Sequence, residues 1–233
     1  MSQPPRPLEQ LWDTLNQSTK ILGQDDLALL QEALTHTSSG LNPHHEQLEF
    51  LGDAVLRLAA SEFIAKAYPS MPVGERSSLR AQLVSDRWLA QLGQTIEIDH
   101  WWRIGPKASG DSTAAATIRA ELSEALIGAA YKINGLKAVH QWLTPHWKVS
   151  AEAVLSDPHR CNSKSALQEW SQGQGRGLPT YSSEEISQHH GDSRRFHCTV
   201  TLPPQLAAEG WGRSRREAEQ QAARAALDQL TDI

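Results

Sequence analysis

Three carboxylates stand inside an otherwise apolar stretch, HHEQLEFLGDAVL, which covers residues 44–56. If the stretch is helical, at about 100° per residue, Glu46, Glu49 and Asp53 share one face. Like charges three or four residues apart destabilise a helix by roughly 0.2–0.5 kcal/mol per pair. Burial raises this cost unless a cation neutralises the charges. The stretch therefore predicts an acidic site that either water or a metal ion must solvate.

A second pair of acids lies in the stretch AELSEALIGAAY, residues 120–131. Glu121 and Glu124 are three residues apart and share one helical face, with Ala125 and Gly128 close to them. Small residues beside acids allow another backbone to approach closely. The two acids occupy positions where a buried helix usually carries aliphatic residues, so we expect them to meet another element of the chain.

Several predicted helices would position these acids. Asp25 is a candidate N-cap for one of them, and the first acidic helix is expected to end near Ala67, because two prolines and a glycine follow it. Gly135 is expected to end the second acidic helix. In chain order, helices are predicted over residues 8–22, 25–34, 44–67, 77–93 (as one or two helices), 114–134 and 136–155.

The first acidic helix also predicts two apolar surfaces. Its core-facing stripe, on the side opposite the acids, is expected to contain Leu48, Leu51, Val55 and Leu58. Phe50 lies at roughly 100° from Glu49, beside the acids rather than among the leucines. This phenylalanine therefore needs a cover other than that core.

The pattern changes after a polar, proline-containing interval at residues 156–163, which we interpret as a linker. A short helix, three strands and an alanine-rich helix are predicted beyond it. In the second of these strands, Phe196, Cys198 and Val200 alternate with polar residues, which is typical of a strand with one buried face. The predicted fold is multidomain: an all-α domain over 1–155, then a small α+β domain, in the order α-β-β-β-α, over 164–233.

Composition limits the classes of protein that fit. The chain has 233 residues, 39% of them hydrophobic, and a net charge of −5. Residues 1–157 hold 13 Lys+Arg against 18 Asp+Glu, whereas residues 158–233 hold nine of each, so the excess acid lies in the first part. No apolar stretch approaches the length of a membrane span, and the N-terminus lacks a signal-peptide pattern. The expected location is the cytoplasm, with Cys161 and Cys198 reduced and passive.

The motifs are similar to those of a known family. HEQLEFLGDAVL resembles the signature helix of bacterial ribonuclease III, and AELSEALIGAAY resembles the second acidic helix of that family. KSALQEW, LPTY, RRFHCTV and GWGRSRREAEQQAARAAL resemble successive pieces of the double-stranded-RNA-binding fold. The resemblance covers nearly the whole chain. It implies an endoribonuclease that cleaves double-stranded RNA, with Mg²⁺ as cofactor and Mn²⁺ as a substitute.

The resemblance also implies roles for single residues. Asp53 and Glu124 would be the catalytic pair, Glu46 a secondary acidic residue, and Phe50 would insert into a second subunit, which implies a homodimer with two active sites. The metal ligands would be Glu49, Asp53, Glu121 and Glu124. The RNA contacts of the C-terminal domain would be Gln168, Glu169, His189, His190, Arg215 and Arg216.

Two positions depart from the family pattern. Glu121 stands where the family usually has Asp, so its carboxylate reaches about one methylene further. Val73 stands where the family has another acid, and Glu75, two residues on, is a candidate substitute.

The expected reaction leaves 5′ phosphates, 3′ hydroxyls and short 3′ overhangs, in the processing of rRNA and other structured transcripts. The alternative is a non-catalytic double-stranded-RNA-binding or ribosome-associated protein of the same fold. Such a protein has no physical reason to keep four acids at the ligand positions. A third interpretation, an acidic metal protein acting on small phosphoesters, is disfavoured by the RNA-binding pattern.

Overall fold

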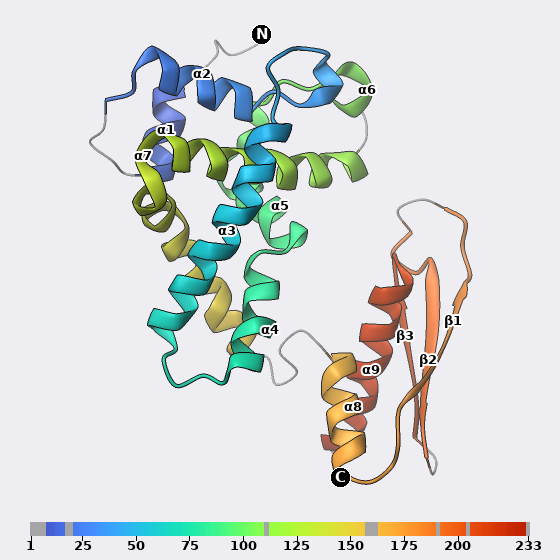
Figure 1. The fold of residues 1–233 in the computed structure, drawn as a ribbon. Helices are drawn as coiled ribbons and strands as arrows, with labels where there is room; N and C mark the ends of the chain where they lie inside the picture. The colour runs from blue at the N-terminus through green and yellow to red at the C-terminus, as the bar shows by residue number, and fades with distance from the viewer. Residues whose placement is uncertain are drawn as a thin grey trace. The chain divides into compact units, whose positions relative to one another are not determined.

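The computed structural model describes residues 8–16, 21–109, 112–156, 163–189, 192–203 and 206–231. The chain divides into two compact units, Met1–Val154 and Leu155–Ile233, and each is described by itself (Figure 1). The last helix of the first unit ends at Ser156 and the next helix begins at Ser163. The predicted linker between them lies largely outside the described residues, so its bounds stay a prediction.

The regular secondary structure in the described part of the first unit is helical, apart from an isolated bridge between Thr35 and Arg103. The helices are α1 Leu8–Asn16, α2 Gln24–Ala33, α3 Glu46–Ala67, α4 Val73–Leu83, α5 Asp86–Thr95, α6 Pro106–Ser109 and α7 Ser112–Ser156, with 3-10 turns η1 Thr37–Ser39 and η2 Ile98–His100. The predicted cap at Asp25 is wrong. Gly23 caps α2, and the Asp26 carboxylate accepts a hydrogen bond from its backbone N–H at 3.0 Å.

Gly52 and Gly128 mark the closest approach of α3 and α7, which cross in the centre of the unit (Figure 1). A Cβ at Gly52 would overlap the carbonyl oxygen of Glu124, and a Cβ at Gly128 would overlap that of Leu48. Both positions therefore require glycine, and the close approach predicted at Gly128 is confirmed. The crossing brings the acids of α3 beside those of α7.

The buried face of α3 differs from the predicted stripe. Leu48 and Val55 are buried as expected, but Leu58 is 51% exposed. The buried face is centred near Gly52 and Ala59, and Leu58 lies more than about 100° away from that centre. Phe50 is 85% exposed, so the first unit alone does not cover it.

α7 is bent where the sequence predicted a helix end. Asn134 and Gly135 leave the helical conformation, and Gly135 has φ 68°, which glycine adopts without strain. Two tryptophans of the segment after this break and one phenylalanine of α3 are large aromatic side chains of the core. Trp142 and Trp147 are fully buried, and Trp147 lies 5.6 Å from Phe63 of α3 between ring centroids.

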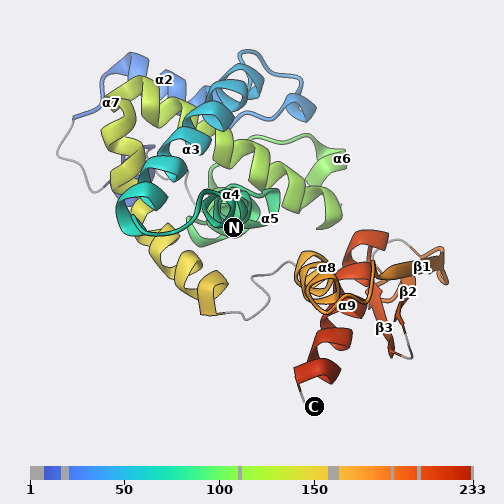
Figure 2. The same cartoon turned by 60° about the horizontal axis from the view of Figure 1, so that its bottom comes forward.

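The second unit is a three-stranded antiparallel sheet with two helices on one face (Figure 2). Its elements are α8 Ser163–Gly173, β1 Thr180–Glu185, β2 Phe196–Leu202, β3 Leu206–Gly212 and α9 Arg215–Thr231. Cys198 and Val200 of β2 are buried with Leu167, Ala222 and Ala226, so the predicted alternation of this strand is confirmed. The predicted fold class, a helical domain followed by an α-β-β-β-α domain, is confirmed.

Two expectations from composition concern cysteines and membranes. Cys198 is a free, buried thiol, while Cys161 lies outside the described residues. None of the helices in the described ranges combines the length and the apolar character that crossing a membrane requires.

Candidate active site

The predicted acids meet in a pocket of about 480 Å³ at the crossing of α3 and α7. Four residues that line this pocket come from the N-terminal half of α3, and two histidines come from the segment before that helix. The lining residues are His36, Thr37, His45, Glu46, Glu49, Phe50, Asp53, Glu121 and Glu124. All four predicted metal ligands therefore lie together, although they are up to 75 positions apart in the chain.

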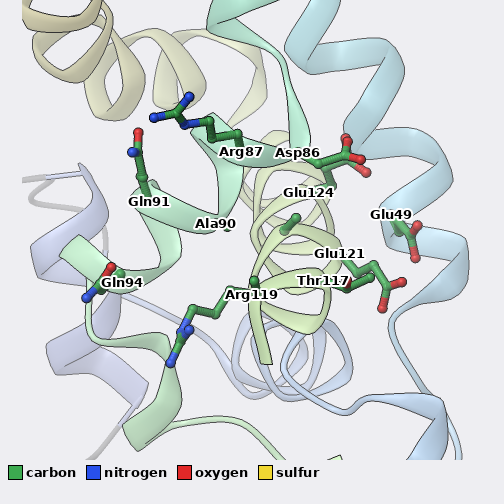
Figure 3. Close-up of a pocket in the computed structure, with 12 residues that line it drawn as sticks. Glu49, Asp86, Arg87, Ala90, Gln91, Gln94, Thr117, Arg119, Glu121 and Glu124 are labelled. Carbon is green, nitrogen blue, oxygen red and sulfur yellow. The ribbon is translucent and has the colours of Figure 1, made fainter. Parts of the chain in front are cut away.

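A second pocket, of about 550 Å³, lies between α5 and α7 (Figure 3). It shares Glu49, Glu121 and Glu124 with the first pocket and adds Asp86, which lies next to Glu124 in the close-up. Asp86 is the first residue of α5, after the N-cap Ser85, whose hydroxyl accepts a hydrogen bond from the backbone of Trp88. Asp86 was not predicted as a site residue, because an acid after a capping serine is typical of a helix start.

Glu124 carries the largest electrostatic perturbation of the acid cluster. Burial raises the pKa of its carboxyl group, and the charges of Asp53, Glu49 and Asp86 raise it further, to about 7 from an ordinary value of 4.5. Burial also raises the pKa of Glu49. Without a cation, the cluster therefore keeps a proton at pH values where isolated carboxylates have lost theirs.

Two imidazoles counteract the repulsion at Glu121. Hydrogen bonding by His45 lowers the pKa of Glu121 most, and the charges of His36 and His45 contribute, against the opposing effect of burial. Burial lowers the pKa of His36. For His45 burial acts in the same direction but is outweighed by Glu121 and Glu49, so that its pKa is raised. Neither histidine was predicted as a site residue, although His45 precedes the acidic helix directly.

Asp53 has a different neighbour. The Arg57 side chain, one turn further along α3, donates a hydrogen bond from Nε to Oδ1 of Asp53 at 2.8 Å. Both side chains are substantially exposed, so this ion pair is screened and contributes little to stability. Arg57 therefore presents no structural obstacle to a metal ion at Asp53.

The donor atoms of the pocket fit a divalent metal ion. Glu49, Asp53, Glu121 and Glu124 line one pocket and form an oxygen-rich site, which suits a hard cation such as Mg²⁺. One ligand atom each from His36, His45 and Glu121 also lie within 4.8 Å of one another, a spacing compatible with a shared ion. The pocket thus offers both carboxylate oxygens and imidazole nitrogens as donor atoms.

Comparison with known proteins identifies the family. A family model described as Ribonuclease-III-like matches residues 26–147, and one described as Double-stranded RNA binding motif matches residues 163–230. The chain is 55% identical over 207 residues to Ribonuclease 3 of Prochlorococcus marinus, which covers 88% of this chain and 83% of that protein. The chain belongs to the ribonuclease III family.

Other ribonuclease III relatives agree. Ribonuclease 3 2 of Synechocystis sp. is 40% identical over 202 residues, covering 86% of this chain and 83% of that protein. The solved nuclease domain of ribonuclease III from Campylobacter jejuni superposes with a TM-score of 0.50 at 27% identity, over 63% of this chain and 94% of that one. The predicted membership of the ribonuclease III family, and with it the prediction of an endoribonuclease, is confirmed.

Two positions at which the ribonuclease III pattern has an acid, Glu46 and Val73, differ in their distance from the site. The Glu46 side chain is 63% exposed on the rim of the pocket, 4.0 Å from Nδ1 of His44. Val73 is 78% exposed at the start of α4. In the described structure, neither Val73 nor Glu75 lines the two pockets that contain the acids. The structure therefore offers no support for Glu75 as a substitute.

The predicted RNA contacts lie on three separate segments of the second unit. Gln168 and Glu169 are exposed on α8, His189 is exposed after β1, and His190 lies outside the described residues. Arg215 and Arg216 are exposed in the first turn of α9. The Ser214 hydroxyl caps this helix by accepting a hydrogen bond from the backbone of Glu217 at 3.2 Å. The helix N-terminus thus combines its partial positive charge with two guanidinium groups.

Proposed function

We propose that this ribonuclease III chain cleaves double-stranded RNA with Mg²⁺ as its ion and Mn²⁺ as a substitute. The observation that carries the proposal is that Glu49 and Asp53 of α3 line one pocket with Glu121 and Glu124 of α7. Acids packed this closely are stable together only when protons or a cation neutralise them. A cation is the neutraliser that lets them act at neutral pH.

Glu49, Asp53, Glu121 and Glu124 would hold the ion. A divalent ion in this position lowers the pKa of water and stabilises the leaving oxygen of a phosphodiester. Asp53 and Glu124 would be the indispensable pair, one from each helix at the crossing fixed by Gly52. Glu46, exposed on the rim, would have a secondary role. The expected products have 5′-phosphate and 3′-hydroxyl ends.

The exposed apolar residues of α3 support a homodimer. Phe50 and Leu58 are spaced eight residues apart, with the exposed Ala54 between them, and form an apolar strip beside the acids. The structure from Campylobacter jejuni is described as having a region involved in dimer formation of its nuclease domain. A second copy that covers Phe50 would place two acidic pockets in one assembly. Each pocket would cut one strand, which produces short 3′ overhangs.

The second unit would supply the preference for duplex RNA. A-form RNA presents a shallow minor groove with 2′-hydroxyls, and phosphates line both sides of the narrow major groove. Gln168 and Glu169 would contact 2′-hydroxyls, the segment at His189 and His190 a second minor groove, and Arg215 and Arg216 phosphates. This mode reads shape rather than sequence, which suits rRNA precursors and other structured transcripts as substrates.

One incubation tests the proposal. Long double-stranded RNA and single-stranded RNA of the same length are incubated with the protein, with Mg²⁺ and with a chelator. We expect short duplexes with 5′ phosphates only from the duplex RNA and only with Mg²⁺. If the protein binds duplex RNA but never shortens it, the alternative of a non-catalytic RNA-binding or ribosome-associated protein replaces the enzyme.

A further inference from the structure

His36 and His45 contact the acid cluster but have no part in the metal chemistry proposed above. Nε2 of His36 lies 3.1 Å from Oε2 of Glu121. Nε2 of His45 lies 3.2 Å from Oε2 of Glu49 and 3.7 Å from Oε2 of Glu121. The two rings stack with their centroids 4.8 Å apart. The histidines thus face Glu121 and Glu49 as a pair.

The neighbours of His36 determine which ring nitrogen carries the proton. Nδ1 of His36 accepts a hydrogen bond from the backbone N–H of Ser38 at 3.2 Å, and Oγ of Ser38 lies 2.8 Å from the same nitrogen. That Oγ accepts a hydrogen bond from the backbone of Gly105 at 2.9 Å, so its own proton is available to Nδ1. Because Nδ1 accepts, the proton of a neutral ring lies on Nε2, which donates to Glu121.

The position of His45 is equally constrained. Its side chain is only 3% exposed, and its backbone N–H donates to the carbonyl of Thr35 at 2.9 Å. With the ring fixed by burial, Nε2 is the nitrogen that faces the carboxylates of Glu49 and Glu121.

The segment that presents His36 is anchored to a distant part of the chain. The backbone N–H of His36 donates to the carbonyl of Arg103 at 2.9 Å, and the N–H of Arg103 donates to the carbonyl of Leu34 at 2.8 Å. Gly105 packs so closely on η1 that a Cβ there would overlap the carbonyl oxygen of Ser38. The imidazole is therefore held by a rigid backbone frame rather than by its contact with Glu121.

We propose that His36 and His45 are positioning residues that orient Glu121 and Glu49 for the metal ion, an inference that rests on the proposed function. Nε2 of His36 donates to one oxygen of Glu121 and leaves the other oxygen for the ion, while Nε2 of His45 faces Oε2 of both Glu49 and Glu121. Glu121 needs this more than the Asp usual at its position, because its longer side chain has an additional rotatable bond. Partners of this kind typically change metal affinity by about 10- to 100-fold when they are removed.

The competing interpretation makes the imidazoles themselves ligands. Two imidazole nitrogens and a carboxylate within 4.8 Å would suit Zn²⁺. The hydrogen bonds to Nδ1 of His36 favour donation instead, because a ligating Nε2 would require a proton on Nδ1 opposite the N–H of Ser38. The two interpretations predict different behaviour for a glutamine substitution, since the amide N–H of Gln replaces a donor but not an imidazole ligand.

The experiment measures Mn²⁺ binding by electron paramagnetic resonance, without RNA, in the full chain. The variants are His36→Leu, His36→Gln, His45→Leu and His45→Gln. We expect about tenfold weaker binding or more for each Leu variant, and affinity within about threefold of the wild type for each Gln variant. His140→Leu is the matched control, because His140 contacts Glu62 of α3 at 2.7 Å outside the acid cluster. Its affinity should equal that of the wild type.

Three outcomes overturn the inference. The first is wild-type affinity in the Leu variants. The second is that the Gln variants lose as much Mn²⁺ affinity as the Leu variants and that only the wild type shows a Co²⁺ absorption band. This result would make the imidazoles ligands. The third, no Mn²⁺ binding by the wild type and by His140→Leu, would reject the proposed function itself.

Gly105→Ala is a second test, because it displaces Ser38 without altering any imidazole or carboxylate, and it should weaken Mn²⁺ binding in the same direction.

Discussion

The acid cluster of the first unit and the predicted RNA contacts of the second unit differ in how they are solvated. Around Glu124, carboxylates from different helices are packed together, and burial with repulsion raises a pKa to about 7. Gln168, His189 and Arg215 are exposed, and each lies on a different segment. The acid cluster is destabilised by repulsion when no cation is bound, whereas the predicted RNA contacts are solvated by water.

This difference has a consequence for substitutions. Removing a charge from the acid cluster should destroy function while relieving repulsion in the metal-free protein. Removing a charge from the RNA contacts should reduce affinity by a modest increment and leave the stability of the fold nearly unchanged.

Glu124→Gln is expected to lower the rate of duplex-RNA cleavage by at least about 10³-fold, because a ligand of the ion is worth several kcal/mol in the transition state. RNA affinity should stay within about twofold of the wild type, since the second unit is unchanged. Single-turnover cleavage and filter binding measure the two quantities. Glu62→Gln is the control, because Glu62 is an exposed acid of α3 outside the acid cluster, and it should cleave at the wild-type rate. Equal losses of cleavage rate in Glu124→Gln and Glu62→Gln would contradict the prediction that cleavage depends on the acid cluster.

Phe50→Ala is expected to weaken the dimer by about 10- to 100-fold, corresponding to the roughly 1.5–3 kcal/mol of a buried phenylalanine. Sedimentation equilibrium over a range of concentrations measures the dissociation constant. Val149→Ala is the matched control, because Val149 is 70% exposed on α7. An unchanged dissociation constant for Phe50→Ala, or an equal change in the control, would reject the interface.

The double variant Arg215→Ala with Arg216→Ala is expected to bind duplex RNA about tenfold more weakly near physiological salt. The slope of log affinity against log salt should become shallower by about 1–2, since two phosphate contacts are lost. Arg224→Ala, further along α9, should leave the slope as it is. If the double variant keeps the wild-type slope, these arginines do not contact phosphate.

The fold was largely predictable because its signals are local. Helical periodicity, the glycine at 135 and the strand alternation around Cys198 follow from neighbouring residues, and the structure confirms them. Leu58 was predicted wrongly, because the buried side of α3 depends on which helices pack against it. The N-cap of α2 was predicted wrongly for a different reason, because a glycine has no side chain that could mark it as a cap.

The acids of the site could be found from the sequence, and their supporting residues could not. Glu49 and Glu124 stand out because charges interrupt apolar faces, and each lies in a stretch that resembles one of the two acidic helices of the family. His36 belongs to a turn that is placed by its bridge to Arg103, a contact between residues far apart in the chain. Asp86 enters the site only because α5 packs beside α7. Such contacts depend on the three-dimensional arrangement, which no local pattern contains.

The pKa of Glu124 makes the metal-free protein sensitive to pH. Because the folded-state pKa is raised from 4.5 to about 7, the contribution of this group to stability is full below the lower value and is lost as the pH rises through the higher one. The carboxyl group of Glu124 should therefore lower the melting temperature of the metal-free wild-type protein at about pH 8 relative to about pH 5.5. Glu124→Gln lacks the titrating carboxyl and should lack this part of the dependence.

Calorimetric melting of the first unit at about pH 8, with a chelator and then with Mg²⁺, tests the central claim that a cation relieves the repulsion of these acids. In chelator, Glu124→Gln should melt a few degrees above the wild type, given roughly 2–4 °C per kcal/mol for a chain of this size. With Mg²⁺ the wild type should gain more than the variant, so that the difference shrinks or reverses. A variant that melts at or below the wild type in chelator, with an equal Mg²⁺ shift for both proteins, would contradict the account.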